Sequence, residues 1–171
     1  IFSKQAVFPL GDREVTLLDT PGHVDFSCEM ERTLQVLDCA VLVVSAAGGV
    51  QAHTLTLWRL LEKRRVPVFL FINKMDLAGA DREALLASLR ERLGEGFVDF
   101  GGDPAALYEE AATASEEALT EYLETGALSD AALSALIGQR AVFPCWFGSA
   151  LKLTGVDEFL AGLARYAPRP V

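Results

Sequence analysis

Several features that assign proteins to broad classes are missing from this sequence of 171 residues. Its three cysteines, Cys28, Cys39 and Cys145, are widely spaced and form no C-x-x-C pair. We expect buried free thiols of a cytosolic protein, not metal ligands. Basic residues are also few, 15 against 24 acidic ones, which gives a formal net charge of −9. This charge argues against a general nucleic-acid-binding surface, although it leaves a local RNA contact open.

Long hydrophobic runs are missing as well. The two most apolar stretches, residues 40–47 and 66–72, are too short to span a bilayer. No basic stretch precedes an early apolar segment, as it would in a signal peptide. The chain opens at Ile1 without a methionine, and its first residues already have the pattern of a strand. We therefore interpret the sequence as a fragment of a longer protein, with enough apolar residues (51%) for one domain with a hydrophobic core.

A further absence concerns phosphate binding. The loop G-x-x-x-x-G-K-[ST], whose backbone amides and lysine cradle nucleotide phosphates, occurs nowhere in the 171 residues. Any nucleotide contact made by this stretch therefore has to come from other motifs.

What is present is an alternation of apolar strands and amphipathic helices. Residues 2–8 and 14–19 predict a β-hairpin, and the continuous apolar runs at 40–46 and 67–72 predict strands buried on both faces. Later segments continue the alternation, with helices predicted at 28–37, 51–65, 80–93 and 156–166 and a strand at 141–147. The pattern predicts an α/β fold with a mostly parallel sheet and helices on both faces.

The alternation is interrupted between residues 94 and 140. A stretch rich in glycine and proline comes first, and two short helices are predicted at 115–123 and 129–137, each with a serine N-cap. Gly126 fits as the stop between them. We predict that 94–140 is a helical insertion before the last strand, within a single partial domain that spans 1–171.

The first motif with chemical content is Asp19-Thr20-Pro21-Gly22-His23. A carboxylate at the end of a strand points into the crevice where α/β sheets bind ligands, and Mg²⁺ needs few protein ligands because it keeps its waters. Gly22 can present its amide to a terminal phosphate because no side chain blocks the approach. His23 would then lie over the attacking water. The structural alternative is a strand that ends at an aspartate and continues into an ordinary Pro-Gly turn.

The second motif is Asn73-Lys74-Met75-Asp76, which follows the next predicted strand but one. One carboxylate can accept two hydrogen bonds from the N1–H and the exocyclic amine of guanine, and adenine lacks that donor pair. The aliphatic stem of Lys74 would cover the base, and Asn73 would tie neighbouring loops together. The alternative is a loop of solvated charge.

The third motif is Gly148-Ser149-Ala150-Leu151, between the last predicted strand and the last helix. The backbone amide of Ala150 could donate to the guanine carbonyl. Alone this motif is a weak signal, because Ser-Ala is common and a plain loop explains it as well. The motif gains significance from its position, because all three motifs follow predicted strands. Along the chain, the phosphate-sensing motif comes first, the base-recognition motif second and this motif, which would cap the base, third.

These motifs carry a family resemblance. The stretch DTPGHVDFSCEMERTLQVLDCAVLVVSAAGGVQAHTLTLWR (19–59), together with FINKMD (71–76) and FGSALKLTGVDEFL (147–160), resembles the G domain of the translation GTPases, in particular the elongation factor G group. Residues 116–140 resemble the helical segment before the last strand in elongation factor G and in the tetracycline ribosomal protection proteins. Residues 46–53 and the brief insertion favour a resemblance to the tetracycline ribosomal protection proteins over one to elongation factor G.

The resemblance implies a P-loop-NTPase-like G domain in a cytoplasmic protein of protein biosynthesis that binds GTP and GDP with Mg²⁺ and hydrolyses GTP on the ribosome. By resemblance, Asp19 holds the metal through a water, Gly22 senses the γ-phosphate, and His23 positions the attacking water as the catalytic residue. The guanine pocket would consist of Asn73, Lys74, Asp76, Ser149 and Ala150.

In the family, the phosphate loop and the first strand of the sheet precede the position of Ile1. We therefore expect this fragment to bind GTP poorly and not to turn it over, because the phosphate loop supplies most phosphate binding. The vacant strand position would expose sheet edges, which favours self-association or a rearranged sheet.

Two other classes stay open as alternatives. The chain could be a non-catalytic interaction module with a degenerate G domain. An ATP- or metal-dependent hydrolase is disfavoured by Asp76 in its N-K-x-D setting and by the absence of zinc-ligand spacing.

Overall fold

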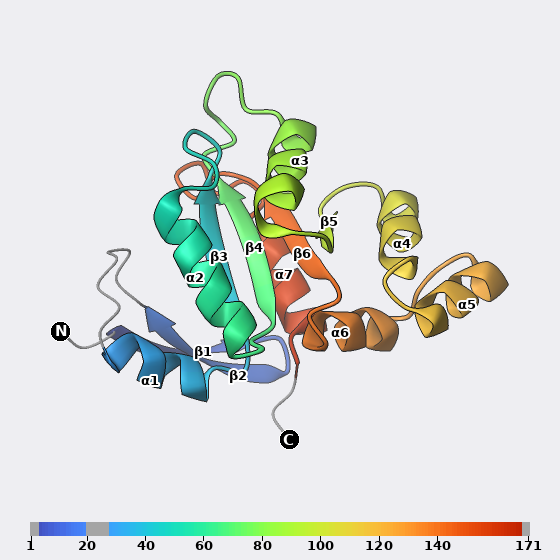
Figure 1. Cartoon of the computed structure of the whole chain (residues 1–171), viewed down its shortest axis with the longest axis horizontal. Coiled ribbons are helices and arrows are strands. Elements are labelled where there is room, and N and C mark those ends of the chain that lie inside the picture. Colours follow the sequence, from blue (N-terminus) through green and yellow to red (C-terminus); the bar gives the residue numbers. More distant parts are fainter. Residues whose placement is uncertain (1–3, 20–27, 169–171) are drawn as a thin grey trace.

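The computed structural model describes residues 4–19 and 28–168, and it contains the predicted alternation of strands and helices (Figure 1). The first part of the chain forms β1 (Lys4–Leu10), β2 (Arg13–Asp19), α1 (Cys28–Val36), β3 (Ala40–Ser45), α2 (Ala52–Lys63), β4 (Val68–Asn73) and α3 (Arg82–Leu93). The remainder forms β5 (Phe97–Asp99), α4 (Pro104–Ala112), α5 (Glu116–Thr125), α6 (Asp130–Gly138), β6 (Phe143–Phe147) and α7 (Val156–Tyr166). Most boundaries lie within three residues of those expected.

The main sheet has four strands in the order β3-β4-β6-β5, and every neighbouring pair is parallel. β3 and β4 pair over six residues, from Ala40 opposite Val68 to Ser45 opposite Asn73. The chain crosses over between strands through helices, as parallel pairing requires. The prediction of an α/β fold with a mostly parallel sheet is confirmed.

Two apolar cores lie on opposite faces of this sheet. Along β4, alternate side chains point to opposite faces, so Leu70 and Ile72 join one core and Phe69 and Phe71 the other. The first core is completed by α2 and α3, and the second by α6 and α7; Figure 1 shows α2 and α7 on opposite sides of the strands. Within the described ranges, no helix is long and apolar enough to cross a membrane.

Strand β3 departs from the prediction that it is buried on both faces. Leu42 and Val44 face the first core and are buried, but Val41 and Val43 on the opposite face are 38% and 60% exposed. The reason is position: β3 ends the order of the four-stranded sheet, and the helices of the second core lie against β4 and β6.

The prediction of a purely helical insertion over 94–140 also has to be corrected. Residues 97–99 form β5, which pairs with β6 from Phe97 opposite Phe143 to Asp99 opposite Cys145 and so extends the main sheet. The sequence pattern hides this strand because three residues are too short for a period-2 signal. α4 was missed as well, although Asp103 caps it and Pro104 occupies its first turn, a combination typical of helix starts.

Helix ends in this segment follow the capping expectations. The Ser115 hydroxyl accepts a hydrogen bond from the amide of Ala118, and the Ser129 hydroxyl accepts one from the amide of Ala132. Gly126 ends α5 in the left-handed conformation, with φ of 76°. These three positions were predicted from the sequence and are confirmed.

The N-terminal hairpin forms a sheet of its own. β1 and β2 pair antiparallel, from Lys4 opposite Asp19 to Leu10 opposite Arg13, and no ladder joins them to the four-stranded sheet within the described residues. Arg13 donates a hydrogen bond to the carbonyl of Ala167, which ties the hairpin to the end of α7.

Candidate functional site

The carboxyl ends of β4 and β6 lie side by side at one edge of the sheet (Figure 1). Ile72 near the end of β4 pairs with Phe147 at the end of β6. In open α/β sheets, ligands bind in the crevice outside the carboxyl ends of the strands. The loops that follow these two strands carry the second and third motifs, so the fold brings both motifs to the edge where ligands bind.

Three hydrogen bonds join the two loops. The amide of Ala150 donates to Oδ1 of Asn73 at 2.9 Å, a contact between residues 77 positions apart in the sequence. The amide of Met75 donates to the carbonyl of Gly148 at 3.0 Å, and the amide of Gly148 donates to the carbonyl of Ile72 at 3.0 Å. The two loops therefore hold each other in a fixed arrangement.

The second motif presents its charged side chains to solvent. Lys74 and Asp76 are exposed, and Asn73 is half-buried. Lys74 has a φ of 66°, a left-handed conformation that is uncommon outside glycine, asparagine and aspartate. Among the described residues, no hydrogen bond or ion pair engages the Asp76 carboxylate, so its acceptor oxygens are available to a ligand.

The third motif starts a tight loop of residues 148–155. Ser149 is 1% exposed, and it exchanges two backbone hydrogen bonds with Thr154, of 2.9 and 3.0 Å. Its hydroxyl accepts a further bond from the amide of Lys152 at 3.2 Å. A Cβ at Gly148 would lie 2.1 Å from the carbonyl oxygen of Thr154, so only glycine fits there.

The Ala150 amide differs in one respect from its expected role. The sequence assigned this N–H to a guanine carbonyl, and in the structure it donates to Asn73. A base carbonyl at this position would have to share the donor with Asn73 or replace it. The contact nevertheless places the expected donor at the sheet edge, next to the motif that carries Asp76.

A charged pair beside these loops was not found from the sequence. Nη2 of Arg82, the first residue of α3, lies 2.8 and 2.7 Å from the two carboxylate oxygens of Asp99 at the end of β5. Its guanidinium carbon lies 4.8 Å from the centre of the Phe147 ring. The sequence did not reveal this pair because β5 was not predicted. Without β5, nothing in the sequence placed Asp99 at the same edge of the sheet as Arg82.

The first motif falls mostly outside the described residues. Gly22 and His23 lie in the undescribed stretch 20–27, so the structure gives no distance between His23 and Asp76. Asp19 ends β2 in the separate hairpin, and its side chain is not described. Of the three motifs, the structure brings together the second and the third.

The described residues include side chains of the types that could hold a metal ion. Within residues 4–19 and 28–168, no group of three or more His, Cys, Asp and Glu side chains is placed to hold a metal ion. The carboxylate of Asp19, the magnesium ligand expected from the sequence, lies outside the described part of the chain.

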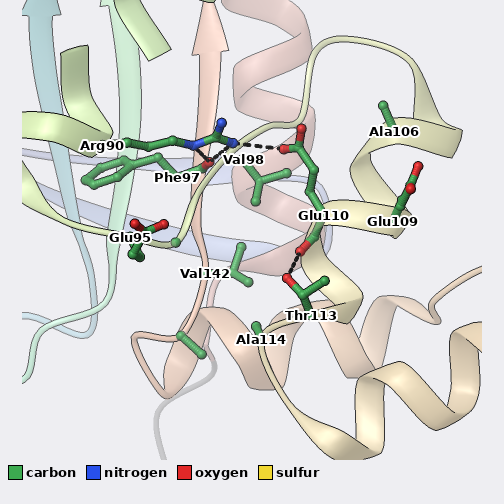
Figure 2. A pocket seen from close by; sticks show the side chains of 12 residues that line it. Arg90, Glu95, Phe97, Val98, Ala106, Glu109, Glu110, Thr113, Ala114 and Val142 are labelled. Carbon is green, nitrogen blue, oxygen red and sulfur yellow. Dashed lines mark hydrogen bonds and ion pairs between the residues drawn. The ribbon is translucent and has the colours of Figure 1, made fainter. Parts of the chain in front are cut away.

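A hollow of about 730 Å³, open to solvent, lies elsewhere in the described chain. Figure 2 shows Arg90 in it, with Nη2 donating to the Phe97 carbonyl at 2.7 Å and to Glu110 at 3.0 Å. Its lining includes Gly96 and Val142, which precede β5 and β6, and residues of α4 such as Ala106 and Glu109, so the hollow lies toward the amino ends of these two strands. Nε and Nη2 of Arg90 already bond within the protein, and the sheet edge with the paired loops remains the better candidate.

Comparison with known structures supports the fold. A crystal structure from Thermus thermophilus superposes with a TM-score of 0.83 over 99% of this chain, at 23% sequence identity. The chain covers 32% of that protein, or about a third of its length. At this identity the match establishes the fold alone.

The sequence itself matches a described family. The family of the elongation factor Tu GTP binding domain matches residues 1–169, which is nearly the whole chain. The match contains both loops at the sheet edge and also the first motif, most of which lies outside the described residues. The chain therefore belongs to the elongation factor Tu GTP binding domain family and is a translation GTPase G domain.

Proposed function

We propose that this chain is the guanine-nucleotide-binding part of a cytoplasmic, ribosome-associated translation factor that hydrolyses GTP. The observation that carries the proposal is the hydrogen bond between Asn73 and Ala150. It joins two loops that are far apart in the sequence and that the motifs assign to the same purine. Family membership supports GTP and GDP as the ligands.

The base is recognised through complementary hydrogen bonding. The exposed carboxylate of Asp76 accepts from the N1–H and the exocyclic amine of guanine, and adenine would leave this carboxylate unpaired. The aliphatic stem of Lys74 covers one face of the ring. Asn73, Ser149 and Ala150 keep the two loops in register around it.

Replacing Asp76 with asparagine tests this assignment. Asp76→Asn exchanges an acceptor for a donor, so the site should lose guanine and gain xanthine, which carries a carbonyl where guanine carries an amine. In the full-length gene product we expect GDP affinity to fall by about 10²-fold or more while affinity for xanthosine diphosphate rises. The measurement is fluorescence titration with both nucleotides, and equal effects on both would contradict the assignment.

Hydrolysis is assigned to the first motif. Asp19 would be the residue that helps to hold Mg²⁺, and the ion when bound would neutralise charge on the phosphate oxygens. Gly22 donates its amide to the γ-phosphate, and His23 orients the attacking water. The support for these roles is the sequence DTPGH and the family match over it.

A ribosome assay separates this enzyme from a non-catalytic interaction module. His23→Ala should lower ribosome-stimulated GTP hydrolysis by the full-length product by about 10²–10⁴-fold while GDP affinity stays unchanged. A protein with no hydrolysis in the presence of ribosomes, before any substitution, would favour the interaction module.

The specific type of factor is the finer part of the proposal. The resemblance of residues 46–53 and the short segment 94–140 favour a tetracycline ribosomal protection protein over an elongation factor G. Release of labelled tetracycline from ribosomes by the full-length protein is expected for the first type. Movement of tRNA and mRNA without tetracycline release would assign the second.

A further inference from the structure

Arg82 lies beside the two loops at the carboxyl edge of the sheet. It is the first residue of α3 and follows Asp76 by six positions, so it continues the loop of the second motif. Its guanidinium lies over the ring of Phe147, at 4.8 Å from the ring centre. Phe147 is 8% exposed and directly precedes Gly148, where the loop of the third motif begins.

Asp99 holds the guanidinium in place. Both of its carboxylate oxygens accept from Nη2 of Arg82, at 2.8 and 2.7 Å, and Oδ1 also accepts from the amide of Gly101 at 2.9 Å. A carboxylate held by a second, backbone donor has less freedom than one on the open surface. The Arg82 side chain is 42% exposed, and these contacts keep its guanidinium over Phe147.

Phe147 passes this constraint to the loop that follows it. The amide of Gly148 bonds to Ile72 and its carbonyl to Met75, so a shift of the β6 end moves both contacts between the loops. The Asn73–Ala150 bond lies two residues further on. The position of Arg82 over Phe147 and its ion pair with Asp99 thus affect the backbone that aligns the two motifs.

We propose that Arg82 and Asp99 form a positioning pair that holds the 148–150 loop in register with Asn73 and Asp76 for purine binding. This inference rests on the proposed function. The pair touches no nucleotide and acts through Phe147. Because Asp99 comes from β5, it also connects the 94–140 segment with the base-recognition loops.

The test compares Asp99→Asn with Asp130→Asn in the full-length gene product. Asp130 pairs with Arg165 at 2.7 Å, an exposed ion pair of the same kind that involves α6 and α7 and neither loop. Two readouts are taken: GDP affinity by titration, and amide hydrogen exchange of residues 148–150 without nucleotide.

We expect Asp99→Asn to weaken GDP binding about three- to tenfold, the equivalent of one hydrogen bond, and to speed exchange at 148–150. Asp130→Asn should change neither. Arg82→Lys should retain part of the affinity that Arg82→Met loses, because the lysine keeps the charge but not the planar fork.

The outcomes separate two failures. If Asp99→Asn behaves like Asp130→Asn while Asp76→Asn still switches base preference, the positioning role is wrong and the proposed function stands. If the unmodified protein shows no preference for guanine, or Asp76→Asn does not alter it, the proposed function fails and the positioning role fails with it.

Discussion

Strands β3 and β4 are alike in sequence but differ in burial. Both are continuous apolar runs, and they pair with each other over six residues. Val68 to Ile72 of β4 are all buried, whereas Val41 and Val43 of β3 remain 38% and 60% exposed. A continuous apolar run therefore shows that a strand can be covered on both faces, and the neighbouring elements decide whether it is.

The difference follows from position in the sheet. β4 lies between β3 and β6, so helices that pack on either strand also cover it. On the second face, Phe69 stacks on Trp146 at 6.1 Å between ring centres, and Phe71 lies 5.4 Å from Phe159 of α7. Val41 and Val43 are the register partners of Phe69 and Phe71, one strand further from these aromatic contacts.

The largest loss of stability is expected when a buried side chain of β4 is shortened. Phe69→Ala removes a fully buried ring from the second core and should lower the free energy of unfolding of the 171-residue chain by about 3–5 kcal/mol. Val41→Ala, at the paired position of β3, should cost about 1 kcal/mol or less. Urea denaturation measures both, and equal losses would show that β3 is covered in solution.

A smaller effect separates the two faces of β3 itself. Val44→Ala opens space in the core under α2, where the side chain is 4% exposed, and should cost about 2 kcal/mol. Val43→Ala removes the same two methyl groups from a side chain that is 60% exposed, and should cost about 0.5 kcal/mol. The two variants differ by one position, so their strand propensities match, and reversed costs would contradict the assigned register.

Most of the fold could be predicted because apolar periodicity and caps are local signals. The serine caps at 115 and 129 and the glycine stop at 126 were all identified in the sequence. β5 could not be predicted, because it exists through its pairing with β6 and not through its own three residues. The exposure of Val41 and Val43 escaped prediction for the same reason, since it depends on strand order.

In the candidate site, too, features with a local sequence signal were predicted, and features that depend on contacts between distant segments were not. Asn73 and Ala150 were assigned to one pocket from their positions at strand ends, and the structure places the Asn73 Oδ1 and the Ala150 amide nitrogen 2.9 Å apart. The Arg82–Asp99 pair joins two segments by a side-chain contact that no motif encodes. The role of Asp76 in recognising guanine stays a prediction, and so do the roles of Gly22 and His23.

Thiol chemistry offers a further comparison between the edge and the centre of the sheet. Burial, with a smaller contribution from Asp38, raises the pKa of Cys39, just before β3, from 9.0 to about 11. Burial also raises the pKa of Cys145, in the middle of β6, well above its usual range. We expect alkylation followed by peptide mapping to modify Cys39 increasingly as the pH approaches 11, and Cys145 only on unfolding.

The same pKa shift has a consequence for stability. Below pH 9 the Cys39 thiol is protonated in both the folded and the unfolded chain; between pH 9 and about 11 the unfolded chain loses this proton first. Stability should therefore fall over this window, and the slope should be shallower in Cys39→Ala. Identical slopes for the two proteins would show that the thiol is not held in a desolvated position.

The smallest change in stability is expected from Val43→Lys. β3 ends the order of its sheet, so among the described residues no strand pairs with the side of its backbone that faces away from β4. An open apolar edge favours pairing between copies, and an inserted lysine opposes it because two copies would bring like charges together. Sedimentation velocity of the 171-residue chain should show concentration-dependent association that Val43→Lys reduces, with the free energy of unfolding changed by about 0.5 kcal/mol or less.

Val43→Thr keeps the β-branched shape without the charge and should associate more than the lysine variant. If the unsubstituted chain is monomeric at all concentrations, the exposed face of β3 does not cause self-association. β3 and β4 would then differ in burial alone.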